Sequence, residues 1–111
     1  MLAEWIDGVC SQPDATMPRW LDGEGNLVVI GADAVSPVRM VNVCGTAALL
    51  QLAGARSVPV VVVADSGKDL ADEEIDEILE SGPTATGDGP GRRWPVFEAA
   101  PFDLVTTRIR E

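Results

Sequence analysis

The chain has 111 residues, 46% of them hydrophobic, and its 18 acidic and 8 basic side chains give a formal net charge of -10. This size fits one domain or part of one, and a core this small favours completion by a partner subunit. Histidine is absent, which excludes catalytic pairs and metal sites that need an imidazole. The acidic surplus repels phosphate backbones and anionic lipid, so we expect no direct nucleic-acid binding and no membrane binding.

The two cysteines, Cys10 and Cys44, lack a CxxC spacing, which excludes a zinc site and a disulfide-rich scaffold. We therefore expect no metal and no other cofactor, and a reducing, cytoplasmic location. The start of the chain supports that location, because it carries Glu4 and Asp7 where a signal peptide carries lysine or arginine. The longest apolar run, residues 58–64, is much shorter than the roughly 20 residues of a membrane helix.

Hydrophobic spacing predicts the first elements of the chain. Apolar residues at helical intervals predict a short amphipathic helix over residues 1–10, followed by turn-forming residues up to residue 26. Residues 27–30 are apolar without polar alternation, which predicts a strand buried on both faces, as in a parallel sheet. A brief extended segment is expected over residues 40–43.

A helix made of strong helix formers is predicted to start at Gly45 and Thr46 and to end near Ser57. Residues 60–64 then predict a second strand buried on both faces. Strand, helix and strand in this order form a βαβ unit with parallel strands. The sequence therefore predicts an α/β fold in a single domain over residues 1–111, without an internal linker.

The second half of the chain predicts one amphipathic helix and short extended segments. Asp69 or Asp72 is expected to cap this helix, which turns Ile75, Ile78 and Leu79 inward and is stopped by Gly82-Pro83. The remaining expectations are a mobile loop over 82–91, a short strand over 94–97, and a last turn with a β-branched segment over 102–109.

Asp33 is the strongest candidate for chemistry. It follows the first predicted strand, at the edge where open α/β sheets bind ligands. Burial at that edge would raise the pKa of its carboxyl group and suit it to proton transfer near neutral pH. The alternative is that Asp33 braces its own loop through backbone N–H groups, which the residues alone favour.

Other candidates surround the same edge. Asn42, Gly45 and Thr46 lie at the predicted helix start, where free N–H groups attract phosphate or carboxylate. Simple N-capping by Thr46 is the alternative. Lys68, the single lysine, follows the second predicted strand and would face the same edge as Asp33, although a lone loop lysine is usually solvated.

Five stretches occur in an order that is more specific than any one motif: residues 29–35, 41–46, 57–68, 97–98 and 104–111. Together they resemble the C-terminal half of the translation initiation factor 2B regulatory-subunit and aldose-phosphate isomerase superfamily, over residues 27–111. The resemblance implies a Rossmann-like, dimerising α/β domain. It is a partial domain with a parallel sheet of three to four strands and flanking helices, and residues 1–26 lie outside the resemblance.

In the isomerase branch, the aspartate of the Gly-Ala-Asp motif is an active-site acid or base, which implies that role for Asp33. The resemblance further implies substrate binding by Asn42, Gly45, Thr46 and Lys68. Two features depart from the family. Val43 stands where members usually have lysine, and the family's catalytic cysteine lies in an upstream segment outside this sequence.

The leading hypothesis is an isomerase-like domain that binds a phosphorylated sugar or nucleotide and needs another polypeptide for activity. If active, it would convert the aldose form of a ribose phosphate to the ketose. The family's catalytic cysteine lies outside this sequence, and loss of one acid or base costs a factor of ~100 to 10,000 in rate, so we expect the chain alone to be inactive. The alternative is a non-catalytic assembly or regulatory subunit, in a homodimer or hetero-oligomer. Val43 and the apolar tail over residues 94–109 favour that alternative, and a truncated gene product is a third hypothesis.

Overall fold

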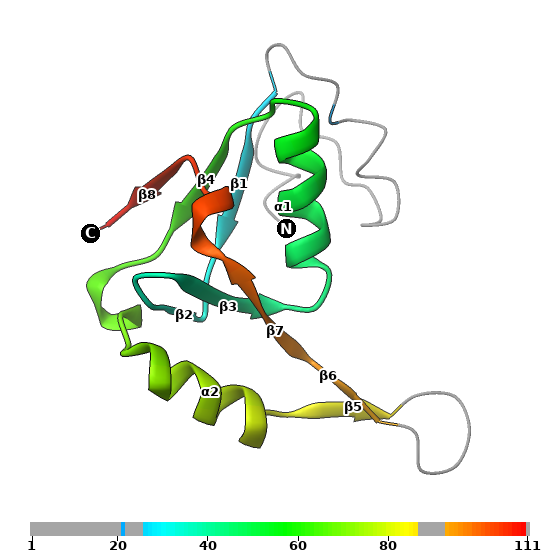
Figure 1. Cartoon of the computed structure of the whole chain (residues 1–111), viewed down its shortest axis with the longest axis vertical. Helices are drawn as coiled ribbons and strands as arrows, with labels where there is room; N and C mark the ends of the chain where they lie inside the picture. The colour runs from blue at the N-terminus through cyan, green and yellow to red at the C-terminus, as the bar shows by residue number, and fades with distance from the viewer. Residues whose placement is uncertain (1–20, 22–25, 87–92, 111) are drawn as a thin grey trace, which may run out of the picture.

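The computed structural model describes residue 21, residues 26–86 and residues 93–110 of the chain. Sheet A, whose three strands run parallel, forms one layer of the molecule (Figure 1). Valine dominates its first two strands because β-branched side chains fit an extended backbone. Across the sheet the order is β1 (Val28–Gly31), β4 (Val60–Val63) and β8 (Thr107–Ile109). The α/β fold with a parallel sheet of three to four strands is therefore confirmed.

A second, antiparallel sheet, sheet B, accompanies sheet A. The sequence predicts extended structure here over residues 40–43, and the structure places that segment at the centre of sheet B. The strand predicted over residues 94–97 reaches sheet B only at its last residue, Phe97. The order across sheet B is β2 (Ala34–Val35), β3 (Arg39–Val43) and β7 (Phe97–Pro101). A separate hairpin joins β5 (Thr84–Thr86) and β6 (Arg93–Pro95).

Helix α1 (Thr46–Ala55) starts and ends as the sequence predicts. Gly45 precedes it with a φ of 104°, a left-handed conformation that favours glycine. At the other end Ser57 has a φ of 58°, and the Val58 N–H closes the helix on the carbonyl of Ala53 at 2.8 Å. This turn leads directly into β4.

Helix α2 (Asp72–Ser81) turns Ile75 inward with Ile78 and Leu79, as predicted. Its expected cap at Asp69 or Asp72 is wrong, because Ala71 occupies the N-cap position. The Glu74 carboxylate accepts a hydrogen bond from the Ala71 N–H instead. The described residues also form two short 3₁₀ turns, η3 (Ser66–Lys68) and η4 (Phe102–Leu104).

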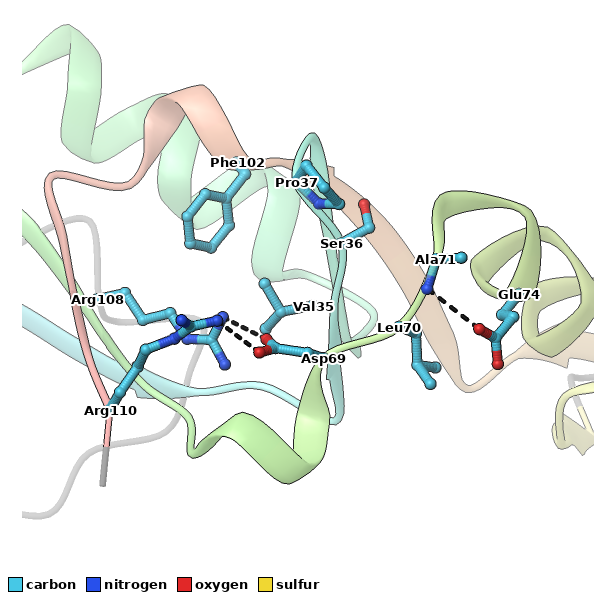
Figure 2. Close-up of a pocket in the computed structure, with 10 residues that line it drawn as sticks. All are labelled: Val35, Ser36, Pro37, Asp69, Leu70, Ala71, Glu74, Phe102, Arg108 and Arg110. Carbon is cyan, nitrogen blue, oxygen red and sulfur yellow. Dashed lines mark hydrogen bonds and ion pairs between the residues drawn. The ribbon is translucent and has the colours of Figure 1, made fainter.

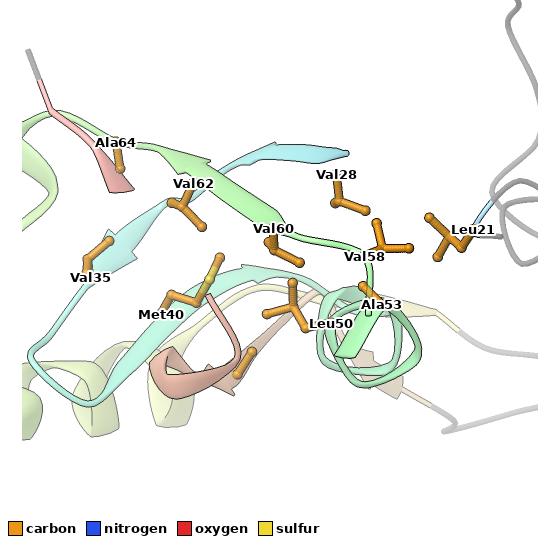
Figure 3. Close-up of a cluster of buried hydrophobic side chains, with 11 residues drawn as sticks. Leu21, Val28, Val35, Met40, Leu50, Ala53, Val58, Val60, Val62 and Ala64 are labelled. Carbon is orange, nitrogen blue, oxygen red and sulfur yellow. The ribbon is translucent and has the colours of Figure 1, made fainter. Parts of the chain in front are cut away.

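Two apolar clusters hold these layers together. In the first, Met40 of β3 and Leu50 of α1 point toward Val60 of β4 (Figure 3). In the second, Val41 of β3 packs with Ile75 of α2. Since side chains alternate along a strand, β3 supplies Met40 to one cluster and Val41 to the other. Sheet B therefore lies between sheet A with α1 on one side and α2 on the other.

Burial of sheet A on both faces is a prediction that the structure corrects. Val28 is 8% exposed, but Val29 is 58% exposed, and Val63 of β4 is 45% exposed. Helix α1 and sheet B cover one face of sheet A in the described part of the chain. The opposite face carries apolar side chains that remain largely exposed, and we call it the open face of sheet A: Leu27, Val29, Val63 and Ile109.

Two further expectations need correction. The loop predicted over residues 82–91 contains strand β5, which pairs with β6 in a way that composition does not reveal. The strand predicted over residues 94–97 is interrupted at Val96, which separates β6 from β7. The helix predicted over residues 1–10 lies outside the described residues.

Candidate functional site

The carboxyl edge of sheet A gathers the predicted chemistry. β1 and β4 are parallel neighbours, with Gly31 paired to Val63. Asp33 therefore follows one strand at the same edge where the loop that carries Lys68 follows the other. Ligands of open α/β sheets bind at this edge, beyond the carboxyl ends of the strands.

Three of the predicted residues come together at this edge. The Asp33 N–H donates to the Val41 carbonyl at 2.8 Å, which places Asp33 beside Asn42 across the start of sheet B. Asp33 is exposed, so the burial expected for it at this edge is wrong. The Asn42 side-chain amide donates to the Thr46 hydroxyl at 3.2 Å. That hydroxyl donates in turn to the Val43 carbonyl at 2.7 Å, so Thr46 does not cap α1 through its side chain, and its N-capping alternative is wrong.

Glu98 of β7, which pairs with Asn42, occupies the start of α1. One of its carboxylate oxygens accepts hydrogen bonds from the N–H groups of Gly45 and Ala47, each at 2.9 Å. A negative charge is stabilised at a helix N-terminus by the free N–H groups and the helix dipole. The chain's own carboxylate therefore takes the position that the sequence suggests for a ligand anion.

Lys68 shares the edge but stands apart from this group. It ends η3, which is opened by the Asp65 carboxylate accepting from the Gly67 N–H at 2.9 Å. The Lys68 side chain is exposed. In the described part of the chain, no hydrogen bond or ion pair joins it to Asp33 or Asn42.

A pocket of about 520 Å³ adjoins the same edge (Figure 2). Arg108 and Arg110, from the last strand and the residue after it, both point at Asp69. Phe102 supplies an apolar wall. None of the five predicted site residues lines the pocket, whose lining is Val35, Ser36, Pro37, Asp69, Leu70, Ala71, Glu74, Phe102, Arg108 and Arg110.

The two arginines of the pocket are held differently. Arg108 bonds the Asp69 carboxylate at 2.6 Å and also donates to the carbonyls of Ala64 and Asp65, and its side chain is only 11% exposed. Arg110 bonds the other oxygen of Asp69 through one terminal nitrogen and is 56% exposed. The hydrogen bond from Arg108, helped by that from Arg110, holds the pKa of Asp69 below its ordinary value.

A second ion-pair network joins sheet B to α2. The Arg39 guanidinium bonds the carboxylates of Asp72 and Asp76, at 2.9 and 3.0 Å. Hydrogen bonds from Arg39 and from the Ser36 hydroxyl lower the pKa of Asp72. This network is structural, because both carboxylates lie on the helix that covers the second cluster.

Other candidate chemistry finds little support in the described residues. They contain no group of cysteines and carboxylates able to hold a metal ion. No helix among them is long and apolar enough to cross a membrane. Cys44 is an exposed free thiol that donates to the Pro95 carbonyl at 3.1 Å.

The sequence reasoning missed Glu98, Asp69, Arg108 and Arg110 as members of this edge. One signal was present: Arg108 and Arg110 are two residues apart, and residues at that interval lie on one side of an extended chain. Nothing local to Glu98 or Asp69 indicates their partners, since these partners lie far away in the sequence.

Comparison with solved structures connects this architecture to known folds. The translation initiation factor eIF-2B of Pyrococcus horikoshii OT3 matches 88% of this chain with a TM-score of 0.70 and 22% identity, over 36% of its own length. The 5-methylthioribose 1-phosphate isomerase of the same organism matches 93%, with a TM-score of 0.68 and 22% identity, over 33% of its length. The eIF-2B delta subunit of A. fulgidus matches 86%, with a TM-score of 0.61 and 17% identity, over 30% of its length.

The chain thus shares its fold with these proteins, as the resemblance in its sequence implies, and it spans about a third of their lengths. No family model matches the chain, and no curated protein sequence matches it. The likeness is therefore one of structure, and the architecture it supports is a partial α/β domain.

Proposed function

We propose that this chain is a domain that binds a phosphorylated sugar or nucleotide at the carboxyl edge of sheet A. Asp33 acts there as an acid or base, and the substrate-binding residues are Asn42, Gly45, Thr46 and Lys68. One observation carries the proposal: Asp33 and Asn42 lie side by side beyond β1, at the ligand-binding edge of a fold shared with a sugar-phosphate isomerase.

The proposed reaction is completed by another polypeptide. An aldose-to-ketose conversion moves a proton between two adjacent carbons, so it needs an acid and a base in fixed positions. Asp33 supplies one of them. Because loss of the other costs a factor of ~100 to 10,000 in rate, the isolated chain is expected to bind its ligand without turning it over. The free thiol of Cys44 fits the reducing cytoplasm that the proposal assumes.

Calorimetric titration tests this proposal. The ligands are ribose 1,5-bisphosphate, methylthioribose 1-phosphate and nucleoside monophosphates. We expect saturable heat for at least one of them, and a loss of about tenfold in affinity for Asn42→Ala, which removes a hydrogen bond to a charged ligand. Asp103→Asn is the matched surface control. No heat from any ligand would remove the site.

A second candidate function is assembly with another polypeptide, as a homodimer or hetero-oligomer. The open face of sheet A favours it, because parallel sheets are ordinarily covered on both faces and here Leu27 and Val29 are 55% and 58% exposed. Light scattering with the parent chain and Val29→Glu tests it. A parent chain that is monomeric at micromolar concentration, alone and in the presence of candidate partners, contradicts assembly.

A further inference from the structure

We propose that the pocket beside Asp69 is a subsite for the phosphate group of the ligand, with Arg110 as the cation that binds it. The inference rests on the proposed function, from which it takes the ligand class, a phosphate monoester. It adds a location and a residue that the sequence did not suggest. Three independent features support it: the closed start of α1, the spare donors of Arg110, and the shape of the pocket.

The start of α1 is already occupied. Glu98 accepts hydrogen bonds from the N–H groups of Gly45 and Ala47, each at 2.9 Å. A phosphate that approached these groups would meet a carboxylate of its own charge sign and would have to displace it. The phosphate is therefore better held at another part of the carboxyl edge, where cations are available, and the contacts proposed for Gly45 and Thr46 are to the uncharged part of the ligand.

Among the residues that the structure describes, Arg110 contributes hydrogen-bond donors that Asp69 does not use. A guanidinium carries five N–H donors, and Arg110 uses one terminal nitrogen on Asp69 while remaining 56% exposed. Arg108 is committed, since it also binds two backbone carbonyls and is 11% exposed. One carboxylate, Asp69, is thus shared by two guanidinium groups. The single negative charge of Asp69 therefore leaves one of the two guanidinium charges beside it uncompensated, and a phosphate can bind there. The other carboxylate of the lining, Glu74, lies away from the arginines and accepts a hydrogen bond from the Ala71 N–H (Figure 2).

The pocket also has room for the rest of the ligand. Its volume of about 520 Å³ lies within the range of ~300 to 1,000 Å³ that small-molecule sites occupy. Phe102 and Pro37 form an apolar wall against which a sugar or base can lie (Figure 2). Asp33 is two residues before Val35 of the lining, so their Cα atoms are within about 7 Å. A ligand anchored on Arg110 therefore extends toward the proposed acid or base.

Two substitutions with opposite expected effects test the subsite. The full chain is titrated calorimetrically with ribose 5-phosphate, adenosine 5′-monophosphate and inorganic phosphate, and with uncharged ribose and adenosine. Arg110→Gln removes the cation, and we expect it to weaken binding of the phosphate esters about tenfold to a hundredfold. Asp69→Asn removes the competing carboxylate, and we expect it to tighten binding. Because misfolding cannot produce a gain in affinity, the second variant separates a binding role from a structural one.

Arg56→Gln is the matched control. Arg56 follows the last residue of α1 and precedes the start of β4, so the substitution removes the same charge far from the carboxyl ends of the strands. It should leave affinity unchanged. If the esters bind and Arg110→Gln binds them as the parent does, or if Asp69→Asn weakens binding, the subsite is overturned while the proposed function stands. Equal losses in Arg110→Gln and Arg56→Gln also overturn it, because they indicate unspecific attraction. If the parent binds none of the phosphorylated ligands, both proposals fail.

Discussion

The two sheets of this molecule differ in how their faces are covered. Sheet B has apolar partners on both sides, because Met40 faces α1 and sheet A while Val41 faces α2, and both are almost fully buried. Sheet A has the more continuous apolar sequence, yet Val29 and Val63 are largely exposed on its open face. Strands that are apolar throughout are typical of sheets covered on both faces. The described residues cover only one face of sheet A.

The difference has a consequence for stability and for assembly. Apolar side chains on the covered faces should carry most of the free energy of folding of the isolated chain. Equivalent side chains on the open face should contribute little to folding and more to contacts with another surface. Pairs of identical substitutions on covered and open faces separate the two contributions.

Leu50→Ala should have the largest effect. Leu50 is fully buried in the first cluster, so its truncation is expected to lower the free energy of unfolding by about 2–5 kcal/mol. Leu27→Ala, on the open face at 55% exposure, should cost about 0.5 kcal/mol or less. Urea unfolding of both variants measures the contrast. Equal losses would mean that the open face is covered in solution.

Ile75→Val tests the second cluster with a smaller change. Ile75 is fully buried between α2 and sheet B, and removal of one methylene there should cost about 0.5–1.5 kcal/mol. Ile109→Val, on the open face, is the control and should be close to neutral. Thermal unfolding checks both. A neutral result at Ile75 would argue against close packing of α2 on sheet B.

Ser57→Gly should stabilise the turn that joins α1, the covering helix, to β4 of sheet A. Ser57 has a φ of 58°, a conformation that glycine adopts without the strain a side chain brings. The expected gain is up to about 1 kcal/mol, seen as a higher melting temperature. Ser66→Gly, at a position without positive φ, should give no gain. A loss at Ser57 would contradict the left-handed conformation.

The ion pair between Arg39 and Asp72 should make the docking of α2 on sheet B sensitive to acid. Hydrogen bonds from Arg39 and then Ser36 lower the pKa of Asp72 in the folded chain. Its stabilising contribution is therefore fully present above the ordinary carboxyl pKa of 3.8 and is lost as the pH falls through the lowered value.

Asp72→Asn should flatten this dependence in acid-unfolding curves, and the effect should be small because the pair is partly exposed. Asp103→Asn, an exposed acid outside the network, is the control. Acid-unfolding curves that coincide for the parent chain and Asp72→Asn would show that the ion pair does not stabilise the fold.

Local sequence signals predicted the elements that depend on local interactions. The valine runs of β1 and β4 and the glycine before α1 were sufficient to place the first two strands of sheet A and the helix between them. Sheet B was not predictable in the same way, because β2 has only two residues and β7 pairs with β3 across a long stretch of sequence. The predicted burial of Val29 was wrong because the apolar pattern of a strand does not show whether the same chain supplies the layer that covers it.

The same distinction between local and long-range interactions applies to the candidate site. The meeting of Asp33 and Asn42 follows from the antiparallel pairing of β2 with β3 across a short connection, whereas the sequence predicted only that both residues lie at the same edge of sheet A. The hydrogen bonds from the start of α1 to Glu98 depend on the long-range pairing of β3 with β7. The ion pairs of Asp69 depend on Arg108 and Arg110, which lie about 40 residues later in the sequence. Such tertiary pairings leave no signal in the neighbouring residues.

We propose the carboxyl edge of sheet A as the binding site for a phosphorylated small molecule. Calorimetric titration of the full chain with ribose 1,5-bisphosphate tests it most directly, alongside Asn42→Ala and Arg56→Gln. We expect saturable binding that Asn42→Ala weakens about tenfold and Arg56→Gln leaves unchanged. Binding that is indifferent to Asn42, or no binding at all, would contradict it.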